Sequence, residues 1–382
     1  INYQGGFVRR GLIGELAFNI GKLLNTNIRF IIFIFQSFIY TLYLLLIFNL
    51  FKRVKINTII LFAIFTPIFL LYPIAELESL GRKETVMYVF FLTLLNIQSY
   101  RNANLFVLFV MPIACLVYEE IILFSGFIYA VLIIKNKIFN FKKFFYLSYL
   151  FIPSFIIVSL FFIYPISVEN HKIMADELLR VFGESCYMSC SMLVTNDINN
   201  ITTMIKTIWS HDISIALILI RYLLIFVIGF FPIMILSYYS EFKYVNFFNK
   251  LKINKIILLF FIFYLPTLPL FLFGGDWGRW IGMIITFTTI FYFYLFKENI
   301  IVIDHSSINK KLIFFKNKKK LATLLFIIFS FGWNQKTTSV EDIATNPLYK
   351  IPYNTSKIIF GFNSIKLFQD NFIIKLHKKY IE

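Results

Sequence analysis

The sequence predicts an all-α membrane protein: a polytopic transmembrane helix bundle of about ten membrane segments, with an N-terminal interfacial amphipathic helix. Hydrophobic residues make up 59% of the chain and charged residues 15%, whereas soluble domains are typically about 45–50% apolar and about 25% charged. The mean hydropathy is +0.77. Basic residues gather in short loops between apolar runs, which is typical of a cytoplasmic membrane face. We therefore expect lipid to cover most of the apolar surface.

Residues 1–27 are the predicted interfacial region on the outer face. From Leu12 to Leu24, apolar residues recur at the spacing of one helix face. Such a helix lies in the plane of the membrane interface. Arg9 and Arg10 would then stand at headgroup level, where guanidinium groups can hold phosphate. An ordinary interfacial anchor with two lipid-contacting arginines explains the same pattern.

The transmembrane bundle is predicted over 28–333, with an outer loop at 165–212 and a C-terminal outer-face tail over 334–382. Several apolar runs are shorter than the roughly 20 residues that a perpendicular span needs. One stretch, 105–134, could form a single helix, a hairpin broken at Glu119-Glu120 or a re-entrant dip. The apolar runs are 28–51, 58–74, 85–97, 105–118, 121–134, 145–164, 213–236, 256–273, 281–296 and 321–333.

Charge favours the hairpin and predicts the orientation. With a hairpin, five loops fall on one side, and together they carry 19 basic residues against three acids. The positive-inside rule makes that side cytoplasmic. It also explains the net charge of +17 without nucleic acid, which we do not expect as a partner. The five loops are 52–57, 98–104, 135–144, 237–255 and 297–320.

Two charged motifs on the opposite, outer side are candidate sites. Five charges lie between Glu76 and Glu84, including Arg82 and Lys83. Glu76 is nearest the membrane boundary, where partial desolvation raises the pKa of a carboxyl, although a solvated turn is the alternative. Glu119 and its neighbour interrupt a long apolar stretch, and charge at membrane depth indicates function by default. The alternative there is a short outer turn.

The motif from Gly274 to Trp280 is the best single candidate. Its glycines permit tight turns, and its tryptophans fit the aromatic belt of a membrane interface. Asp276 and Arg279 are three residues apart, close enough to pair on a helix. The alternative is a belt-anchored turn with a surface ion pair.

Other chemistry finds little support in the sequence. The four histidines are scattered without the spacing of a zinc site, so no metal ligands are predicted. No phosphate-binding loop, dinucleotide fingerprint or nucleophile elbow is visible. Cys186 and Cys190 could pair in an oxidising compartment, or could be two free thiols on a helix.

This arrangement of spans, first outer helix and outward charge resembles the GT-C superfamily of polytopic membrane glycosyltransferases and, more loosely, the envelope polysaccharide polymerases. The resemblance is one of architecture. Glu15 is the only acid in residues 1–27, so the acidic motif typical of the family's first outer loop is not visible. The resemblance implies a bacterial inner-membrane enzyme with a periplasmic active face. Its implied partners are the lipid bilayer, a polyprenyl-phosphate-linked sugar and a glycan acceptor.

The resemblance also implies roles for the outer charged residues. A carboxylate would act as general base, with Asp276, Glu119 and Glu76 as candidates. The phosphate of the lipid carrier would be held by Arg9, Arg10, Arg82, Lys83 and Arg279. A divalent metal ion is a cofactor of some GT-C enzymes, and the sequence leaves open whether one is needed. A membrane transporter or lipid-linked oligosaccharide flippase is the alternative function, and a non-catalytic assembly or anchoring protein is a third.

Overall fold

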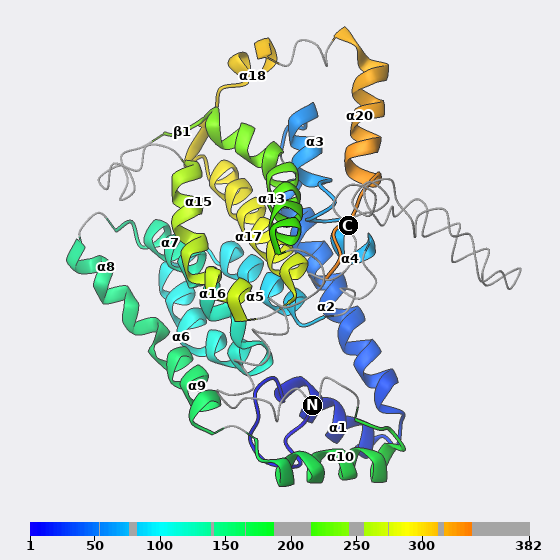
Figure 1. Ribbon diagram of the computed structural model, residues 1–382. Helices are drawn as coiled ribbons and strands as arrows, with labels where there is room; N and C mark the ends of the chain where they lie inside the picture. The colour runs from blue at the N-terminus through cyan, green and yellow to red at the C-terminus, as the bar shows by residue number, and fades with distance from the viewer. Residues whose placement is uncertain are drawn as a thin grey trace, which may run out of the picture.

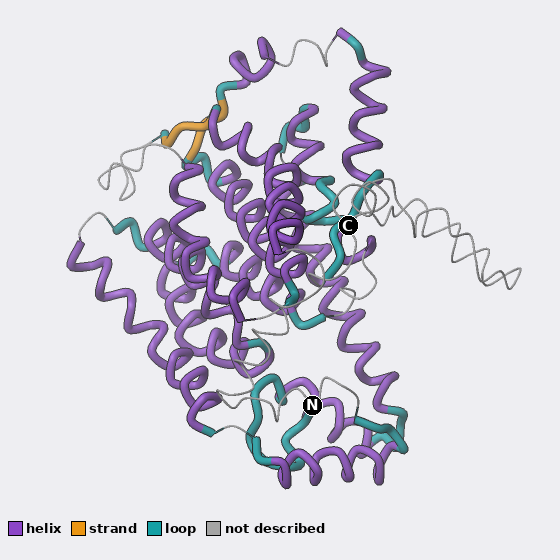
Figure 2. Tube along the Cα trace, viewed as in Figure 1, coloured by secondary structure: helices purple, strands orange, loops and turns teal. Residues whose placement is uncertain are grey.

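The computed structural model describes residues 1–52, 54–75, 82–138, 141–164, 166–186, 215–243, 256–273, 275–311 and 317–337. These residues are mostly helical (Figure 1), with one antiparallel ribbon of β1 (Ser240–Phe242) and β2 (Ile301–Ile303) (Figure 2). Short 3-10 turns are η2 (Glu119–Phe124), η3 (Ser148–Phe151) and η4 (Leu265–Thr267). The helices are α1 (Leu12–Leu23), α2 (Ile28–Phe51), α3 (Thr58–Ile64), α4 (Tyr72–Ala75), α5 (Glu84–Asn96), α6 (Tyr100–Val117), α7 (Ser125–Lys135), α8 (Phe141–Leu147), α9 (Ile152–Ile163), α10 (Val168–Phe182), α13 (Ile215–Tyr238), α15 (Ile256–Tyr264), α16 (Leu268–Phe273), α17 (Trp277–Lys297), α18 (His305–Lys311) and α20 (Lys319–Phe331).

Five helical stretches within the described residues are long and apolar enough to cross a membrane, which indicates an integral membrane protein. The predicted count of about ten spans is not confirmed, because several predicted runs form short helices. At about 1.5 Å per residue, the seven residues of α3 are far shorter than the roughly 30 Å hydrocarbon core. The five stretches are Ile28–Phe51, Tyr100–Val117, Lys142–Ile163, Ile218–Tyr238 and Trp277–Lys297.

Helix α17 forms the centre of the bundle, and α2 lies at its edge. Of an 18-residue stretch in each, 89% is buried in α17 and 17% in α2. Helix α17 contacts α2, α5, α13 and α16, and Figure 1 shows it surrounded by neighbouring helices. A helix that is apolar all round is stable in such a core. In α2, many large apolar side chains are exposed, as expected for a surface that faces lipid.

Residues 105–134 form a hairpin. Helix α6 ends at Val117 and α7 begins at Ser125, with η2 between them. The side chains of Asn104 and Asn136, near the two open ends, exchange hydrogen bonds of 3.2 and 2.9 Å. Because these residues are neighbours in space, the single-helix alternative is wrong. The chain turns at the glutamate pair.

The described parts of the five basic loops gather at one end of the bundle. The β1–β2 ribbon joins two of them. Lys135 Nζ, from a third loop, donates to the carbonyl oxygen of Ile97 (2.6 Å), the residue just before the loop 98–104. Lys52, from the fifth loop, lines one cavity with Gln98 and Lys297. We call this end, where α2, α5, α7 and α17 finish, the lysine end.

A separate layer of two helices, α1 and α10, lies across the opposite end (Figure 1). The predicted amphipathic helix forms as α1, which buries Ala17 and Phe18. The ring of Phe18 packs edge-on against that of Phe182 in α10, with 5.2 Å between centroids. Helix α10 shows that part of the predicted 165–212 loop is helical. It begins after Ser167, whose hydroxyl accepts from the Asn170 N–H (3.1 Å), as an N-cap does.

Candidate functional site

Four segments that are distant in sequence bring charged side chains together at the end opposite the lysine end. They are the loop before α1, the start of α5, the turn between α6 and α7, and the start of α17 (Figure 1). Ion pairs, hydrogen bonds and one cation–π contact connect their side chains. We call this set the charge network: Arg9, Arg10, Arg82, Lys83, Glu84, Tyr118, Glu119, Glu120, Asp276 and Arg279.

Arg10 joins the N-terminal loop to the glutamate pair. Its Nε donates to both carboxylate oxygens of Glu119 at 2.9 Å, and its Nη2 lies 3.0 Å from Glu120 Oε1. Arg9 adds a longer contact, with 3.9 Å between its Nη1 and Glu119 Oε1. Guanidinium–carboxylate contacts of this kind are directional and charge-assisted. They fix the loop, about a hundred residues away in sequence, against the turn after α6.

Arg10 also has an unusual backbone conformation. Its φ of 61° lies in the left-handed region, which costs a residue other than glycine about 1–3 kcal/mol. Lys83 Nζ donates to the Arg10 carbonyl oxygen at 2.7 Å. The contacts of Arg10 thus hold a strained backbone, a feature that concentrates at functional sites.

Arg279 organises the second half of the network. Its Nε donates to Glu84 Oε1 (2.6 Å), and its Nη1 pairs with Asp276. The predicted pairing of Asp276 with Arg279 is therefore confirmed. Arg82 Nη1 lies 3.9 Å from Asp276 Oδ2, so the carboxylate of Asp276 stands between two arginines.

Tyr118 connects the two halves. The guanidinium of Arg10 lies over its ring, 4.6 Å from the centroid, and Arg279 Nη2 donates to its hydroxyl oxygen at 2.8 Å. The residue is 1% exposed. A buried aromatic ring with a polar tip suits this position, because the ring face attracts one cation and the oxygen accepts from the other.

The network has a buried interior and a more accessible rim. In the interior, the side chains of Glu84 and Arg279 are 10% and 11% exposed. On the rim, the side chains of Arg82 and Asp276 are 32% and 33% exposed, and that of Arg9 is 31% exposed. The rim can therefore meet a ligand, while the interior holds the rim in place.

Burial and neighbouring charges shift the pKa values of the network's ionisable groups in different directions. Burial opposes ionisation of Glu119, but Arg10 outweighs it and holds the pKa of Glu119 below its usual value. For Glu120, burial prevails over the attraction of Arg10 and raises its pKa. Burial, assisted by repulsion from Arg10, lowers the pKa of Lys83 to about 8. Adjacent carboxyls thus differ in proton affinity because Arg10 faces one of them more directly.

Gly278, in the Gly274–Trp280 motif, has a packing role. The segment after α20 approaches the start of α17: Gln335 Nε2 donates to the Gly278 carbonyl oxygen (2.6 Å). A Cβ atom at Gly278 would lie 1.7 Å from the Lys336 carbonyl oxygen, so only glycine fits. Trp277 and Trp280 are each 5% exposed, and both pack against the ring of Phe271.

The structure brings together seven of the eight predicted site residues. Glu76 lies outside the described residues. Glu15 is the only acid in residues 1–27. Its carboxylate accepts hydrogen bonds from the Tyr3 N–H (2.7 Å) and the Gln4 side chain (2.8 Å), and so holds the N-terminal loop against α1. The seven are Arg9, Arg10, Arg82, Lys83, Glu119, Asp276 and Arg279.

Sequence reasoning missed three network members as site residues. Glu84 and Glu120 belong to motifs that were recognised, and their position beside apolar runs was an available signal. Tyr118 gave no such signal, because aromatic residues make up 20% of the chain. Its role depends on contacts with Arg10 and Arg279, which come from distant segments.

The described carboxylates do not fit the divalent metal ion that is a cofactor of some GT-C enzymes. Among the described residues, no three His, Cys, Asp or Glu side chains are grouped so that they could hold a metal ion. The carboxylates of Glu84, Glu119 and Asp276 each pair with an arginine, which disfavours a second cation on the same oxygens.

Comparisons of this chain with protein-family models, curated proteins and solved structures found no match.

Proposed function

We propose that the chain is an integral-membrane glycosyltransferase or polymerase that uses a polyprenyl-phosphate-linked sugar in cell-surface glycan assembly. The observation that supports this best is the convergence of Arg9, Arg10, Arg82 and Asp276 at one end of a membrane helix bundle. A lipid-linked donor needs phosphate-binding cations at headgroup level and a carboxylate near its reacting carbon. The rim of the charge network offers both types of group.

The rim arginines are suited to a lipid phosphate. Arg9 and Arg82 are each about one-third exposed, and both stand beside more deeply buried network members. Guanidinium groups bind phosphate through paired, charge-assisted hydrogen bonds. In the proposed mechanism they hold the donor phosphate and stabilise the negative charge that develops as it leaves.

Asp276 is the proposed general base. It is the most exposed carboxylate of the network's ion pairs, at 33%, and a base must reach its substrate. The acceptor hydroxyl oxygen attacks the anomeric carbon, and the bond from that carbon to the phosphate oxygen breaks. The bonding electrons leave with the polyprenyl phosphate, and the hydroxyl proton passes to Asp276. Glu119 accepts two hydrogen bonds from Arg10, so its proposed role is to position that arginine. Glu76 remains a second candidate base.

The proposed orientation places the lysine end in the cytoplasm and the charge network on the periplasmic side of a bacterial inner membrane, with about ten membrane segments in all. The positive-inside rule supports this. A second support is Cys186, which packs beside α10 and is disulfide-bonded. Disulfides persist in oxidising compartments.

The test is to replace Asp276 by Asn in cells and to follow both the surface glycan and its lipid-linked donor. We expect glycan extension to fall by roughly 10²–10⁴-fold, the usual contribution of a general base, while donor accumulates in the outer leaflet. The matched control is Glu241→Gln, which changes an exposed carboxylate in β1 at the lysine end. Unchanged glycan in inserted Asp276→Asn protein would contradict the proposal. Donor accumulation in the inner leaflet would instead identify a flippase.

A further inference from the structure

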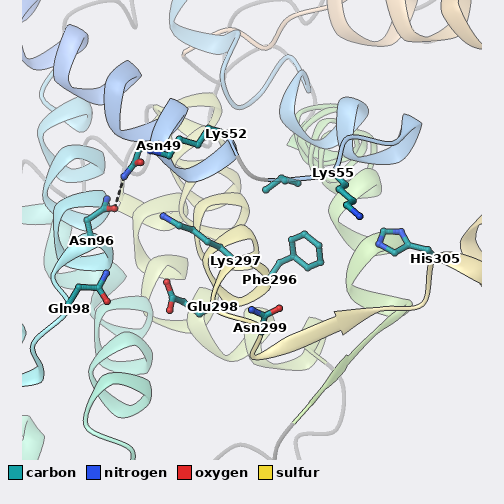
Figure 3. A pocket seen from close by; sticks show the side chains of 11 residues that line it. Asn49, Lys52, Lys55, Asn96, Gln98, Phe296, Lys297, Glu298, Asn299 and His305 are labelled. Carbon is teal, nitrogen blue, oxygen red and sulfur yellow. Dashed lines mark hydrogen bonds between the residues drawn. The ribbon is translucent and has the colours of Figure 1, made fainter.

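The lysine end contains a cavity that the proposed glycosyl transfer does not use. Its volume is about 650 Å³, within the range of roughly 300–1,000 Å³ that is usual for small-molecule sites. Figure 3 shows that its lining comes from the ends of α2, α5 and α17 and from the start of α18. It therefore lies at the far end of the bundle from the charge network.

The lining is rich in hydrogen-bond donors and positive charge. Lys52 and Lys55 reach the cavity from the segment that follows α2, and Lys297 reaches it from the end of α17. Glu298 is the single carboxylate among the described lining residues. No ion pair joins any of these lysines to another residue in the part of the chain that the structure describes. Glu298 interacts electrostatically with Lys135, outside the cavity. The remaining polar lining consists of Asn49, Asn96, Gln98, Asn299 and His305.

The helix dipole explains why two of these three lysines stand where they do. Lys52 caps α2 and Lys297 ends α17, and cations at helix C-termini are favourable. Lys55 is different, because it follows the last residue of α2 by four positions and lies beyond the reach of that effect. It lines the same cavity as the other two lysines (Figure 3), and a lining with three cations and one carboxylate favours an anionic ligand.

We propose that this cavity binds an organic phosphate. Three ammonium groups suit phosphate oxygens, and neutral amides can complete the hydrogen bonds. Inorganic phosphate alone would fill little of the volume, so the ligand carries a further organic part that packs on Phe296 and Val54. The cavity lies where two membrane-length helices end, the depth at which basic pockets meet anionic lipid headgroups. A soluble phosphate ester offers the same chemistry.

The experiment uses the full chain in detergent and two probes, phosphatidylglycerol for the lipid source and ADP for the soluble source. Native mass spectrometry counts retained phosphatidylglycerol against phosphatidylcholine, and thermal shift titration measures ADP. We expect at least one probe to bind, and the binding probe identifies the source. Lys52→Gln combined with Lys297→Gln should weaken that binding by about tenfold or more, because charge-assisted contacts are lost.

The matched control removes two charges from the same end but outside the cavity, by Lys319→Gln with Lys320→Gln; both lysines are exposed in α20. It should change binding by less than about twofold, since exposed distant charges are screened. If the double cavity variant does not fold, Lys55→Gln, at an exposed position, provides the same test with a smaller loss. Failure of both probes to bind the wild-type chain, or equal losses in cavity and control variants, would overturn the proposal.

Discussion

The two ends of the bundle handle charge in opposite ways. At the charge network, arginines and carboxylates are largely buried and paired, as in Arg279 with Glu84. At the lysine end, Lys52 and Lys55 are exposed and line a cavity. Buried pairs must stay complete because an orphaned buried charge is costly, whereas exposed lysines are solvated. Substituting the buried interior charges of the network should therefore lower stability, whereas substituting the lysines at the lysine end should weaken ligand binding.

The largest effect is expected from Arg279→Met. This change leaves Glu84, 7% exposed, without its cation, and breaking a buried pair costs about 3–5 kcal/mol. Unfolding of purified protein in detergent measures the loss. The control is Arg29→Met, which removes an ion pair to Glu184 whose arginine side chain is 69% exposed; such pairs contribute at most about 1 kcal/mol. Similar losses in the two variants would mean that Arg279 is not buried as described.

A packing change at the network end comes next. Gly278→Ala places a methyl group 1.7 Å from a backbone oxygen of Lys336, and overpacking of this kind costs about 1–3 kcal/mol. Gly126→Ala is the comparison, because its new Cβ would meet a ring atom of Phe263 at 3.1 Å, and a side chain can shift. Equal melting temperatures for both variants would show that the segment after α20 does not contact α17.

The third effect depends on pH. Lys83 has a folded-state pKa of about 8, below its usual 10.5. Between these values the unfolded chain keeps the proton and the folded chain releases it, so stability rises with pH. The stability of wild type relative to Lys83→Met should increase by up to about 1.4 kcal/mol per pH unit from pH 8 to pH 10. A flat difference across this range would indicate that Lys83 is solvated.

The smallest effect on stability is expected at the lysine end. Lys52→Gln with Lys297→Gln should change the free energy of unfolding by no more than about 0.5 kcal/mol, as surface substitutions usually do. The same variant should bind the ligand about tenfold or more weakly. A loss of several kcal/mol would mean that these lysines have a structural role like that of Arg279, and the contrast between the two ends would disappear.

The sequence predicted features that depend on local pattern. The spacing from Leu12 predicts α1, and lysine-rich loops predict which helix ends lie together. The pairing of Asp276 with Arg279 follows from their separation of three residues. These predictions succeed because the interacting groups are close in sequence, or because the membrane sorts each loop by its own charge.

Other features depend on tertiary contacts and were not predictable in this way. No feature of the local sequence predicts that Arg10 donates to both carboxylate oxygens of Glu119, which is 109 positions away. Gly278 is needed because Lys336 approaches it. Apolar composition also does not determine the number of spans, because the apolar run that includes α3 has the composition of a span but only seven residues in that helix.

The most direct test of the central claim, that distant charged motifs form one network, is a double-mutant cycle between Arg10 and Glu119. The variants Arg10→Gln, Glu119→Gln and their combination are compared with wild type by unfolding in detergent. Since Arg10 donates to both carboxylate oxygens at 2.9 Å, we predict a coupling energy of about 1.5–3 kcal/mol. Additive losses, with a coupling near zero, would contradict the network.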